Sequence, residues 1–283
     1  MTLDRRLHAY RPDLAAESLR GRVEAKRFAD GTAMQVAANV LPVYAAPEDG
    51  RGRTTELLHG ETVRVYDTAG GWAWMQNDAD SYVGYVRADA LSAPGPASTH
   101  RVAALRSFVY AEPDLKSAVR DWRSIGSRVA AAEHKGGYVR CAGGWMFADH
   151  LAPLGDHAPD WAGTALRFLG TPYLWGGRSS LGLDCSGLVQ VALGEAGIDW
   201  PRDTDMQAAC GEEVPFAGDE AVLRRGDLVF WKGHVGIWAD AGCFVHANAT
   251  HMAVAAEPLA ETMARIERQL GQRVLTVHRP KAA

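Results

Sequence analysis

The sequence predicts an α+β protein in which two small β-rich modules precede a larger carboxy-terminal domain. In the carboxy-terminal domain, apolar residues at three-to-four spacing from Leu188 to Leu193 predict a helix. Strand-like runs between 226 and 248 follow that helix and predict consecutive antiparallel strands. Ahead of residue 154, short alternating strands are separated by Gly and Asp turns, which is the pattern of small barrels.

The first segment, 1–31, is charged and amphipathic, and we expect it to form a helical arm. It has neither the apolar stretch nor the small-residue cleavage site of a secretory signal peptide, and no run elsewhere is long enough to span a bilayer. The four cysteines have irregular spacing, unlike a secreted disulfide framework. These observations predict a cytoplasmic protein without membrane association.

An internal repeat defines the two β-rich modules, which we expect over 32–94 and 99–154. Pro42–Glu48 recurs in degenerate form as Phe108–Asp114, and Pro94–Ser98 is a natural linker between the copies. A second pair of matching segments, Ala88–Leu91 and Ala148–Leu151, closes each copy. The alternating strands expected in the first copy are Glu61–Tyr66, Trp72–Met75 and Tyr82–Val86. Both copies resemble bacterial SH3-like domains.

The third domain, expected over 158–283, contains a cysteine at the start of its amphipathic helix. Asp184 is a suitable N-cap for a helix that begins at Cys185 and ends near Gly194 and Gly197. A thiol in the first turn lies at the positive end of the helix dipole, which favours the thiolate and predicts a pKa below about 8.5. Cys185 is therefore a candidate nucleophile.

Two histidines lie in the strands that follow. If Asp240–Gly242 is the loop of a hairpin, His234 and His246 project from one sheet face as diagonal neighbours. The same register places Ala239 opposite Cys243, His234 opposite Asn248 and Gly236 opposite His246. A cysteine with an imidazole base, and a third polar group that orients the imidazole, is the arrangement that nucleophilic acyl transfer requires.

Each of these residues also has a structural alternative. A lone cysteine in an apolar helix is often a small core residue, and a lone strand histidine is often a satisfied structural one. A zinc site built from Cys185, His234 and His246 is conceivable, but the three residues lack the paired spacing of structural zinc motifs. We therefore expect a nucleophilic site with no metal and no cofactor.

The same residues resemble the NlpC-type bacterial cell-wall cysteine peptidases, which have a papain-like fold and cut peptidoglycan stem peptides. The resemblance covers roughly residues 158–280. Five segments match in order: Tyr173–Gly177, Asp184–Leu188, Pro201–Gln207, Gly226–Phe230, and His234–Ile237 followed by Val245–Ala247. The resemblance implies that Cys185 is the nucleophile, His234 the general base and acid, and His246 the residue that holds the His234 imidazole. It also implies that Tyr173 and the Cys185 backbone amide stabilise the oxyanion.

Candidate substrate contacts surround this set. The resemblance implies that Asp184 pairs with a free amino terminus of the substrate, although the residue is equally suited to capping the helix alone. Asp203, with Arg202, contacts the diamino acid or forms a surface ion pair. Thr204 stands where the family more often has serine and lines the substrate site. Ser186 and Trp175, within the matching segments, complete the set in this domain.

The resemblance also implies that the first SH3-like module contributes a carboxylate and a tyrosine to the recognition of the substrate's amino group. Glu56 and Tyr85 are the candidates. The structural alternatives are a solvated loop charge for Glu56 and a core position for Tyr85.

The function expected from the resemblance is hydrolysis of the γ-D-glutamyl-diamino acid bond in free murein peptides that begin with L-Ala, during cell-wall peptide recycling. A net charge of -4 and a pI near 6.2 argue against binding to nucleic acid or anionic membranes. Three alternatives remain open: an exported hydrolase of intact peptidoglycan, a papain-fold amidase or acyltransferase, and a catalytically idle binding or scaffold protein.

Overall fold

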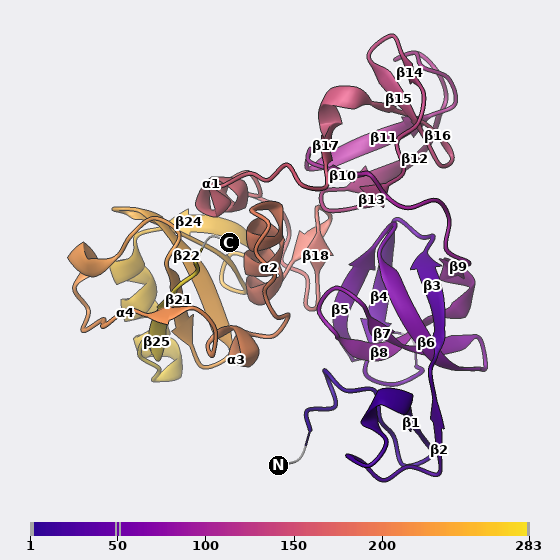
Figure 1. Ribbon diagram of the computed structural model, residues 1–283. Helices are drawn as coiled ribbons and strands as arrows, with labels where there is room; N and C mark the ends of the chain where they lie inside the picture. Colours follow the sequence, from indigo (N-terminus) through magenta and orange to yellow (C-terminus); the bar gives the residue numbers. More distant parts are fainter. Residues whose placement is uncertain (1–2, 49, 51, 282–283) are drawn as a thin grey trace. The chain divides into compact units, whose positions relative to one another are not determined.

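The structure, a computed structural model, describes residues 3–48, 50 and 52–281. The chain divides into two compact units, Met1–Leu154 and Gly155–Ala283 (Figure 1). No helix in the described part of the chain is both long enough and apolar enough to cross a membrane.

The amino-terminal arm is not helical in its described residues, contrary to the prediction. It contains two short parallel strands, β1 (Leu14–Ala16) and β2 (Arg27–Ala29), and a single 3-10 turn at Glu17–Leu19. Pro12 lacks a backbone donor and interrupts the helical pattern. Leu14 and Leu19 are buried in a cluster with Trp74 of the following module, so tertiary burial outweighs local helix preference.

The first β-rich module is a seven-stranded antiparallel sheet, and it contains the three strands predicted from the sequence. The strand order is β5-β4-β8-β7-β6-β3-β9. Val43, Leu57, Val63, Met75 and Val86 form the centre of its hydrophobic core. The strands are β3 (Thr32–Val36), β4 (Val40–Tyr44), β5 (Arg53–Leu58), β6 (Thr62–Ala69), β7 (Trp72–Asn77), β8 (Val83–Arg87) and β9 (Leu91–Ser92).

The second module has two sheets, in the orders β13-β10-β17 and β12-β11-β16-β15-β14. Val102, Val109, Val139 and Met146 form its core. Its strands are β10 (His100–Val102), β11 (Arg106–Tyr110), β12 (Val119–Ser124), β13 (Arg128–Val129), β14 (His134–Lys135), β15 (Tyr138–Cys141), β16 (Gly144–Phe147) and β17 (Leu151–Pro153).

The sequence repeat corresponds to a structural repeat. The matching segments form a 3-10 turn in each module, at Ala88–Ala90 and at Ala148–His150. Each module also packs a glycine against a tyrosine carbonyl: Gly84 lies against Tyr44, and Gly144 lies against Tyr110. A side chain at either glycine would collide with the neighbouring strand, so both positions require a residue without a Cβ.

The second unit is built on a six-stranded antiparallel sheet in the order β20-β25-β21-β22-β23-β24. Its strands are β20 (Glu212–Glu213), β21 (Leu228–Trp231), β22 (His234–Asp240), β23 (Cys243–Asn248), β24 (Ala253–Glu257) and β25 (Thr276–Arg279). Outside this sheet lie the pair β18 (Arg178–Ser179) and β19 (Gly182–Leu183) and the helices α1 (Trp161–Leu166), α2 (Cys185–Glu195), α3 (Thr204–Gln207) and α4 (Leu259–Leu270).

Helix α2 contacts β22 and β23, the two strands that carry the candidate histidines. It begins and ends where the sequence predicts, but it is not amphipathic: every residue except Gly194 is buried. Leu259 and Ile266 of α4 pack into a hydrophobic cluster with Val229, Trp231 and Phe244. Helices α2 and α4 are thus both fixed by buried apolar residues.

Candidate active site

Cys185 is the first residue of α2 and is 7% exposed. The side chain of Asp184 caps the helix by accepting a hydrogen bond from the Gly187 backbone N–H at 2.7 Å. The Cys185 Sγ lies 3.8 Å from Thr204 Oγ1 and 4.0 Å from the Gly233 carbonyl oxygen, to which it donates. The thiol is therefore placed beside the backbone that leads into His234.

The resting state of Cys185 differs from the prediction. Burial, together with the neighbouring Asp184 carboxylate, raises the pKa of the thiol to about 11, and the hydrogen bond with Thr204 offsets only part of the increase. The helix dipole alone would lower the pKa of a thiol in the first turn, but the loss of solvent around this packed thiol outweighs that effect, so the predicted decrease is wrong. At neutral pH Cys185 is a thiol rather than a thiolate.

His234 and His246 project from one face of the sheet and contact each other directly, as predicted. The His234 Nε2 lies 2.8 Å from the His246 Nδ1. Gly236 permits this contact, since a Cβ at that position would lie 2.8 Å from the His246 Cβ and would also collide with the Phe244 ring. The predicted pairing of Ala239 with Cys243 is wrong: the strand bulges there, and Asp240 is the partner of Cys243.

Two residues that the sequence analysis missed extend this arrangement. The His246 Nε2 lies 2.7 Å from Glu257 Oε1, and Arg265 of α4 binds both oxygens of the same carboxylate at 2.5 and 2.6 Å. The register of the hairpin formed by β23 and β24 could have placed Glu257 near His246. A turn after Asn248 that pairs His246 with Ala255 places Glu257 two residues further along the same face.

Both imidazoles are neutral at rest. Burial, reinforced by His246 and Arg265, lowers the pKa of His234 to about 3. Burial also lowers the pKa of His246, although its hydrogen bond to Glu257 opposes that change. Burial alone would raise the pKa of the Glu257 carboxyl, but the hydrogen bonds from His246 and Arg265 outweigh it and hold that pKa well below its usual range. Glu257 is therefore an anion bound by His246 and Arg265.

Asp184 is part of a buried ion pair with Arg202. Arg202 Nη2 lies 2.7 Å from Asp184 Oδ2, and Arg202 Nη1 donates both to Asp184 Oδ1 at 3.0 Å and to Ser186 Oγ at 2.9 Å. The Gly176 backbone N–H donates to Asp184 Oδ2 as well. Asp184 therefore caps α2, but it is not a cap alone, because it also holds Arg202. The predicted surface position of Arg202 is wrong, because Arg202 is 1% exposed and pairs with Asp184 in the interior.

The other predicted residues of this unit lie around the nucleophile or at the surface. Tyr173 is half-buried, and burial together with Cys185 and Asp184 holds its pKa well above the usual range. Asp203 occupies the N-cap position of α3, and Thr204 is the first residue of that helix. Trp175 is 69% exposed. Tyr173 and Thr204 therefore accompany Cys185, whereas Trp175 offers a free aromatic surface.

The two predicted residues of the first module lie on strands β5 and β8, which flank β4 in its sheet. Glu56 is in β5, is 3% exposed, and pairs with Arg53 at 3.1 Å, so the alternative of a solvated loop charge is wrong. Tyr85 is in β8 and half-buried, and its hydroxyl accepts a hydrogen bond from Arg11 at 3.2 Å. Glu56 is thus a buried, paired carboxylate, and Tyr85 is a half-buried side chain whose hydroxyl is hydrogen-bonded.

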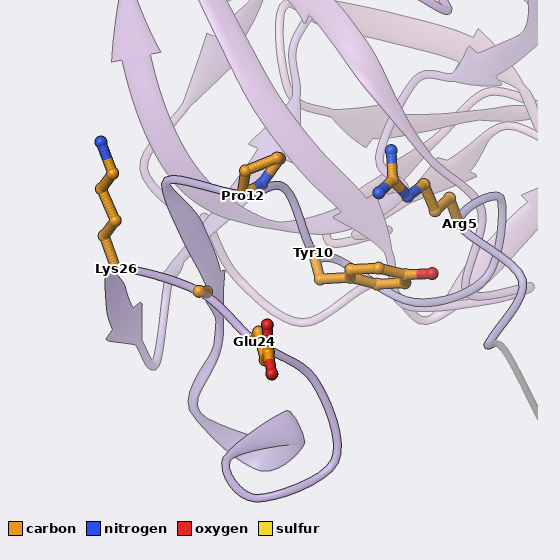
Figure 2. Close-up of a pocket in the computed structure, with 6 residues that line it drawn as sticks. Arg5, Tyr10, Pro12, Glu24 and Lys26 are labelled. Carbon is orange, nitrogen blue, oxygen red and sulfur yellow. The ribbon is translucent and has the colours of Figure 1, made fainter.

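A surface hollow of about 450 Å³ lies in the amino-terminal arm (Figure 2). None of the predicted site residues lines it; its lining residues are Arg5, Tyr10, Pro12, Glu24, Ala25 and Lys26. Within the described residues, no group of three or more His, Cys, Asp or Glu side chains is placed to hold a metal ion.

Comparison with known proteins identifies two regions of the chain. Residues 170–272 match the NlpC/P60 family, and residues 43–91 match the bacterial dipeptidyl-peptidase SH3 domain. A Bacillus subtilis protein named gamma-D-glutamyl-L-lysine dipeptidyl-peptidase is 28% identical over 236 residues, which cover 74% of this chain and 77% of that protein. A Lysinibacillus sphaericus protein named dipeptidyl-peptidase 6 is 28% identical over 75% of this chain and 86% of its own length.

The fold is shared with a solved structure. An NlpC/P60 family protein from Bacillus cereus superposes with a TM-score of 0.74 at 21% identity, over 88% of this chain and 99% of the other. The papain-like architecture predicted for the carboxy-terminal domain, with an SH3 domain before it, agrees with these matches.

Proposed function

Because the chain carries an NlpC/P60 cysteine-peptidase domain behind an SH3 domain of the bacterial dipeptidyl-peptidase type, we propose that it hydrolyses the γ-D-glutamyl-diamino acid bond of small murein peptides that begin with L-Ala. The relatives named for γ-D-glutamyl-L-lysine dipeptidyl-peptidase and dipeptidyl-peptidase 6 support this substrate class, since each aligns along most of its length. The observations that carry the chemistry are the contact between His234 and His246 and the position of the Cys185 thiol against the carbonyl of Gly233, the residue before His234.

In the proposed mechanism the Cys185 sulfur attacks the γ-carbonyl carbon while its proton passes to His234. The tetrahedral oxyanion is held by the Cys185 backbone N–H, which belongs to the first turn of α2 and has no helical partner, and by the Tyr173 hydroxyl. His234 then returns the proton to the leaving amine as the C–N bond breaks. Water, deprotonated by His234, attacks the thioester carbonyl; the C–S bond breaks, L-Ala-D-Glu is released, and His234 returns the proton to the Cys185 sulfur.

Because Cys185 and His234 are both neutral at rest, proton transfer accompanies attack rather than preceding it. The oxyanion donors then contribute more to lowering the activation free energy, since charge appears in the site only as the transition state forms. This assignment gives Tyr173 a measurable role: its loss reduces kcat more than it raises KM.

Recognition of a free amino terminus is the second part of the proposal. We assign the ammonium group to Asp184, which would share its carboxylate between the ammonium and Arg202, and we propose Tyr85 and Glu56 of the first module as further substrate contacts. The support is the match of residues 43–91 to an SH3 domain of the dipeptidyl-peptidase type. Ser186, Asp203, Thr204 and Trp175 are assigned to the rest of the peptide. We assign the second module to the same SH3-like barrel class because it repeats the glycine and 3-10 turn of the first.

The experiment is mass spectrometry of L-Ala-γ-D-Glu-meso-diaminopimelate with a free or an acetylated amino terminus. The wild-type protein and Cys185→Ala are compared under the same conditions. The proposal expects L-Ala-D-Glu from the free peptide with wild type alone. Equal cleavage of both peptides would contradict amino-end recognition and favour an endopeptidase of intact wall; new amides in place of hydrolysis products would favour acyl transfer.

We further propose that the substrate is a free peptide met in the cytoplasm during recycling. An enzyme that binds the free ammonium group of L-Ala can act only after the amide bond to that nitrogen has been hydrolysed. An amidase-type reaction therefore supplies its substrate. Incubation with purified sacculi, with and without prior amidase treatment, tests this order. Release of fragments from untreated sacculi would contradict it, and cell fractionation tests the compartment.

A further inference from the structure

We infer that Glu257, clamped by Arg265, is a positioning residue that fixes the tautomers of His246 and His234 and so keeps one nitrogen of His234 available as the base. The inference rests on the proposed role of Cys185 and His234 in peptide hydrolysis. It adds a carboxylate from β24 and an arginine from α4 to the candidate site.

The three groups form a diagonal row across neighbouring strands. His246 is paired with Ala255, so Glu257 lies on the same face of the sheet, displaced by two residues along β24. His234 lies on the opposite side of His246, on β22, and contacts it at 2.8 Å. His246 therefore connects the base to the carboxylate.

The carboxylate determines which nitrogen of each ring carries a proton. An ionised carboxylate can only accept hydrogen bonds, so the His246 Nε2 at 2.7 Å must be the donor. In a neutral His246 the Nδ1 is then an acceptor, and the His234 Nε2 that contacts it must carry the proton. The His234 Nδ1 is left with a free lone pair, which is what a general base requires.

Arg265 keeps this arrangement in one orientation. Its two terminal nitrogens bind the two Glu257 oxygens, and both side chains are largely buried, at 14% and 12% exposure. A bidentate arginine prevents the carboxylate from rotating and holds it ionised. Without the clamp, a buried carboxylate beside a neutral imidazole would more readily accept a proton and become a donor.

The competing explanation is that the Glu257–Arg265 pair merely ties α4 to the sheet. Leu259, Thr262 and Ile266 already bury that face of the helix, so α4 has an anchor independent of the ion pair. A tie between elements would affect the free energy of unfolding alone. A positioning residue also affects the tautomer of His234 and the pH dependence of the reaction.

The decisive variant is Glu257→Gln. Arg265 binds the amide oxygen of the new side chain, which turns its NH₂ group toward the His246 Nε2. His246 then carries its proton on Nδ1, donates to the His234 Nε2, and forces the His234 proton onto Nδ1. The base is removed without any loss of volume. We expect kcat to fall about 10²- to 10⁴-fold, the range associated with general-base catalysis, with KM changed less than about threefold.

The matched control is Glu267→Gln, on the same helix. Glu267 pairs with Arg273, which is 84% exposed, and that pair has no contact with the histidines. Arg265→Lys is the conservative companion, since it retains a cation but loses the bidentate contact. We expect wild-type kcat for Glu267→Gln and an intermediate loss, about tenfold, for Arg265→Lys.

The readout that a structural tie would not alter is the ¹⁵N NMR spectrum of histidine-labelled full-length protein near pH 7. In the wild type we expect His234 and His246 both to be protonated on Nε2, and in Glu257→Gln both on Nδ1. His234 protonated on Nδ1 in the wild type would overturn the inference even if the variant failed to fold. Loss of activity in Glu257→Gln with unchanged tautomers would overturn it too.

The pH profile gives a second test, and all the ionisable neighbours must be considered. His246 is surrounded by His234 on β22, Glu257 on β24, Arg265 on α4 and His251 in the turn between β23 and β24. Removing the Glu257 charge makes protonation of either imidazole harder. We expect the acidic limb of the kcat/KM profile to move to lower pH in Glu257→Gln; an unmoved limb would count against the inference.

Failure of the substrate proposal is distinguishable from failure of this inference. Alkylation of Cys185 by iodoacetamide requires no substrate, and it depends on the same base. If the wild type cleaves neither peptide but shows the Nε2 tautomers and alkylates at least tenfold faster than Glu257→Gln, the substrate is wrong and the positioning role stands. Equal alkylation rates with equal tautomers would remove the positioning role whatever the substrate is.

Discussion

Arg202 is almost completely buried and binds Asp184, the residue immediately before Cys185, through two hydrogen bonds of 2.7 and 3.0 Å. The same carboxylate caps α2. The position of the nucleophile is thus set by a salt bridge between the segment before the helix and the segment that leads into α3.

Loss of the arginine would leave a buried carboxylate without its partner. We expect Arg202→Leu to lower the free energy of unfolding by about 3–5 kcal/mol, because an uncompensated buried charge is costly. Urea denaturation measures the difference. Arg273→Leu is the control, since its partner Glu267 is exposed and the expected change is less than about 1 kcal/mol. A change below about 1 kcal/mol for Arg202→Leu would mean that Asp184 is held in some other way.

Replacement of Cys185 separates chemistry from stability. Cys185→Ala removes one sulfur from a site of 7% exposure, so we expect no measurable turnover and a thermal midpoint within a few degrees of wild type. Cys210→Ala is the matched control, since that thiol is half-buried and its Sγ contacts the Met206 carbonyl. Residual turnover in Cys185→Ala, or its loss in Cys210→Ala, would contradict the assignment of the nucleophile.

The state of the resting thiol can be measured directly. Because burial raises the pKa of Cys185 to about 11 and lowers that of His234 to about 3, we expect no ultraviolet absorbance from a Cys185 thiolate at pH 7 and its appearance only as the pH approaches 11. A thiolate absorbance that persists down to pH 5 would instead indicate a thiolate–imidazolium pair. The difference spectrum between wild type and Cys185→Ala isolates this thiol from the other cysteines.

Gly236 tests how closely the histidines must approach. A methyl group there would meet the Cβ of His246 and the Phe244 ring, so we expect Gly236→Ala to displace His246 and lower kcat by at least about tenfold. Gly194→Ala is the control, because a Cβ at that position of α2 meets no atom within 4 Å. Wild-type kcat in Gly236→Ala would show that the strands tolerate a wider separation.

Acid should destabilise the protein through its neutral histidines. The pKa of His234 is about 3 in the folded protein and about 6.5 in the unfolded chain, so between these values the unfolded state binds the additional proton. Stability is then lost as pH falls below about 6.5. The depressed pKa of Glu257 acts in the same direction. We expect the thermal midpoint to fall by at least about 5 °C from pH 7 to pH 4; scanning calorimetry measures it, and a midpoint constant over this range would disagree with buried neutral imidazoles.

Much of the second unit could be predicted because its signals are local. The N-cap at Asp184, the apolar run after Cys185 and the hairpin that carries His234 and His246 each follow from neighbouring residues. The predictions that failed depend on distant contacts. The arm is not helical because its apolar residues are buried with Trp74, and the pKa of Cys185 rises because the fold removes its solvent.

The role proposed for Glu257 also depends on distant contacts and could not be predicted from its neighbours in the sequence. Its sequence context, a carboxylate at the end of a short strand rich in alanine, indicates nothing about catalysis. It gains a role only when β24 pairs with β23 and α4 brings Arg265 to it. The candidate nucleophile, the candidate base and His246 could therefore be predicted from motifs, whereas Glu257 and Arg265 required the structure.

The most direct test of the account is the product formed from L-Ala-γ-D-Glu-meso-diaminopimelate. The account predicts that wild-type protein releases L-Ala-D-Glu and free diaminopimelate, that acetylation of the amino terminus prevents release, and that Cys185→Ala yields neither product. An unchanged peptide mass after prolonged incubation with active-site-titrated wild-type protein would contradict it.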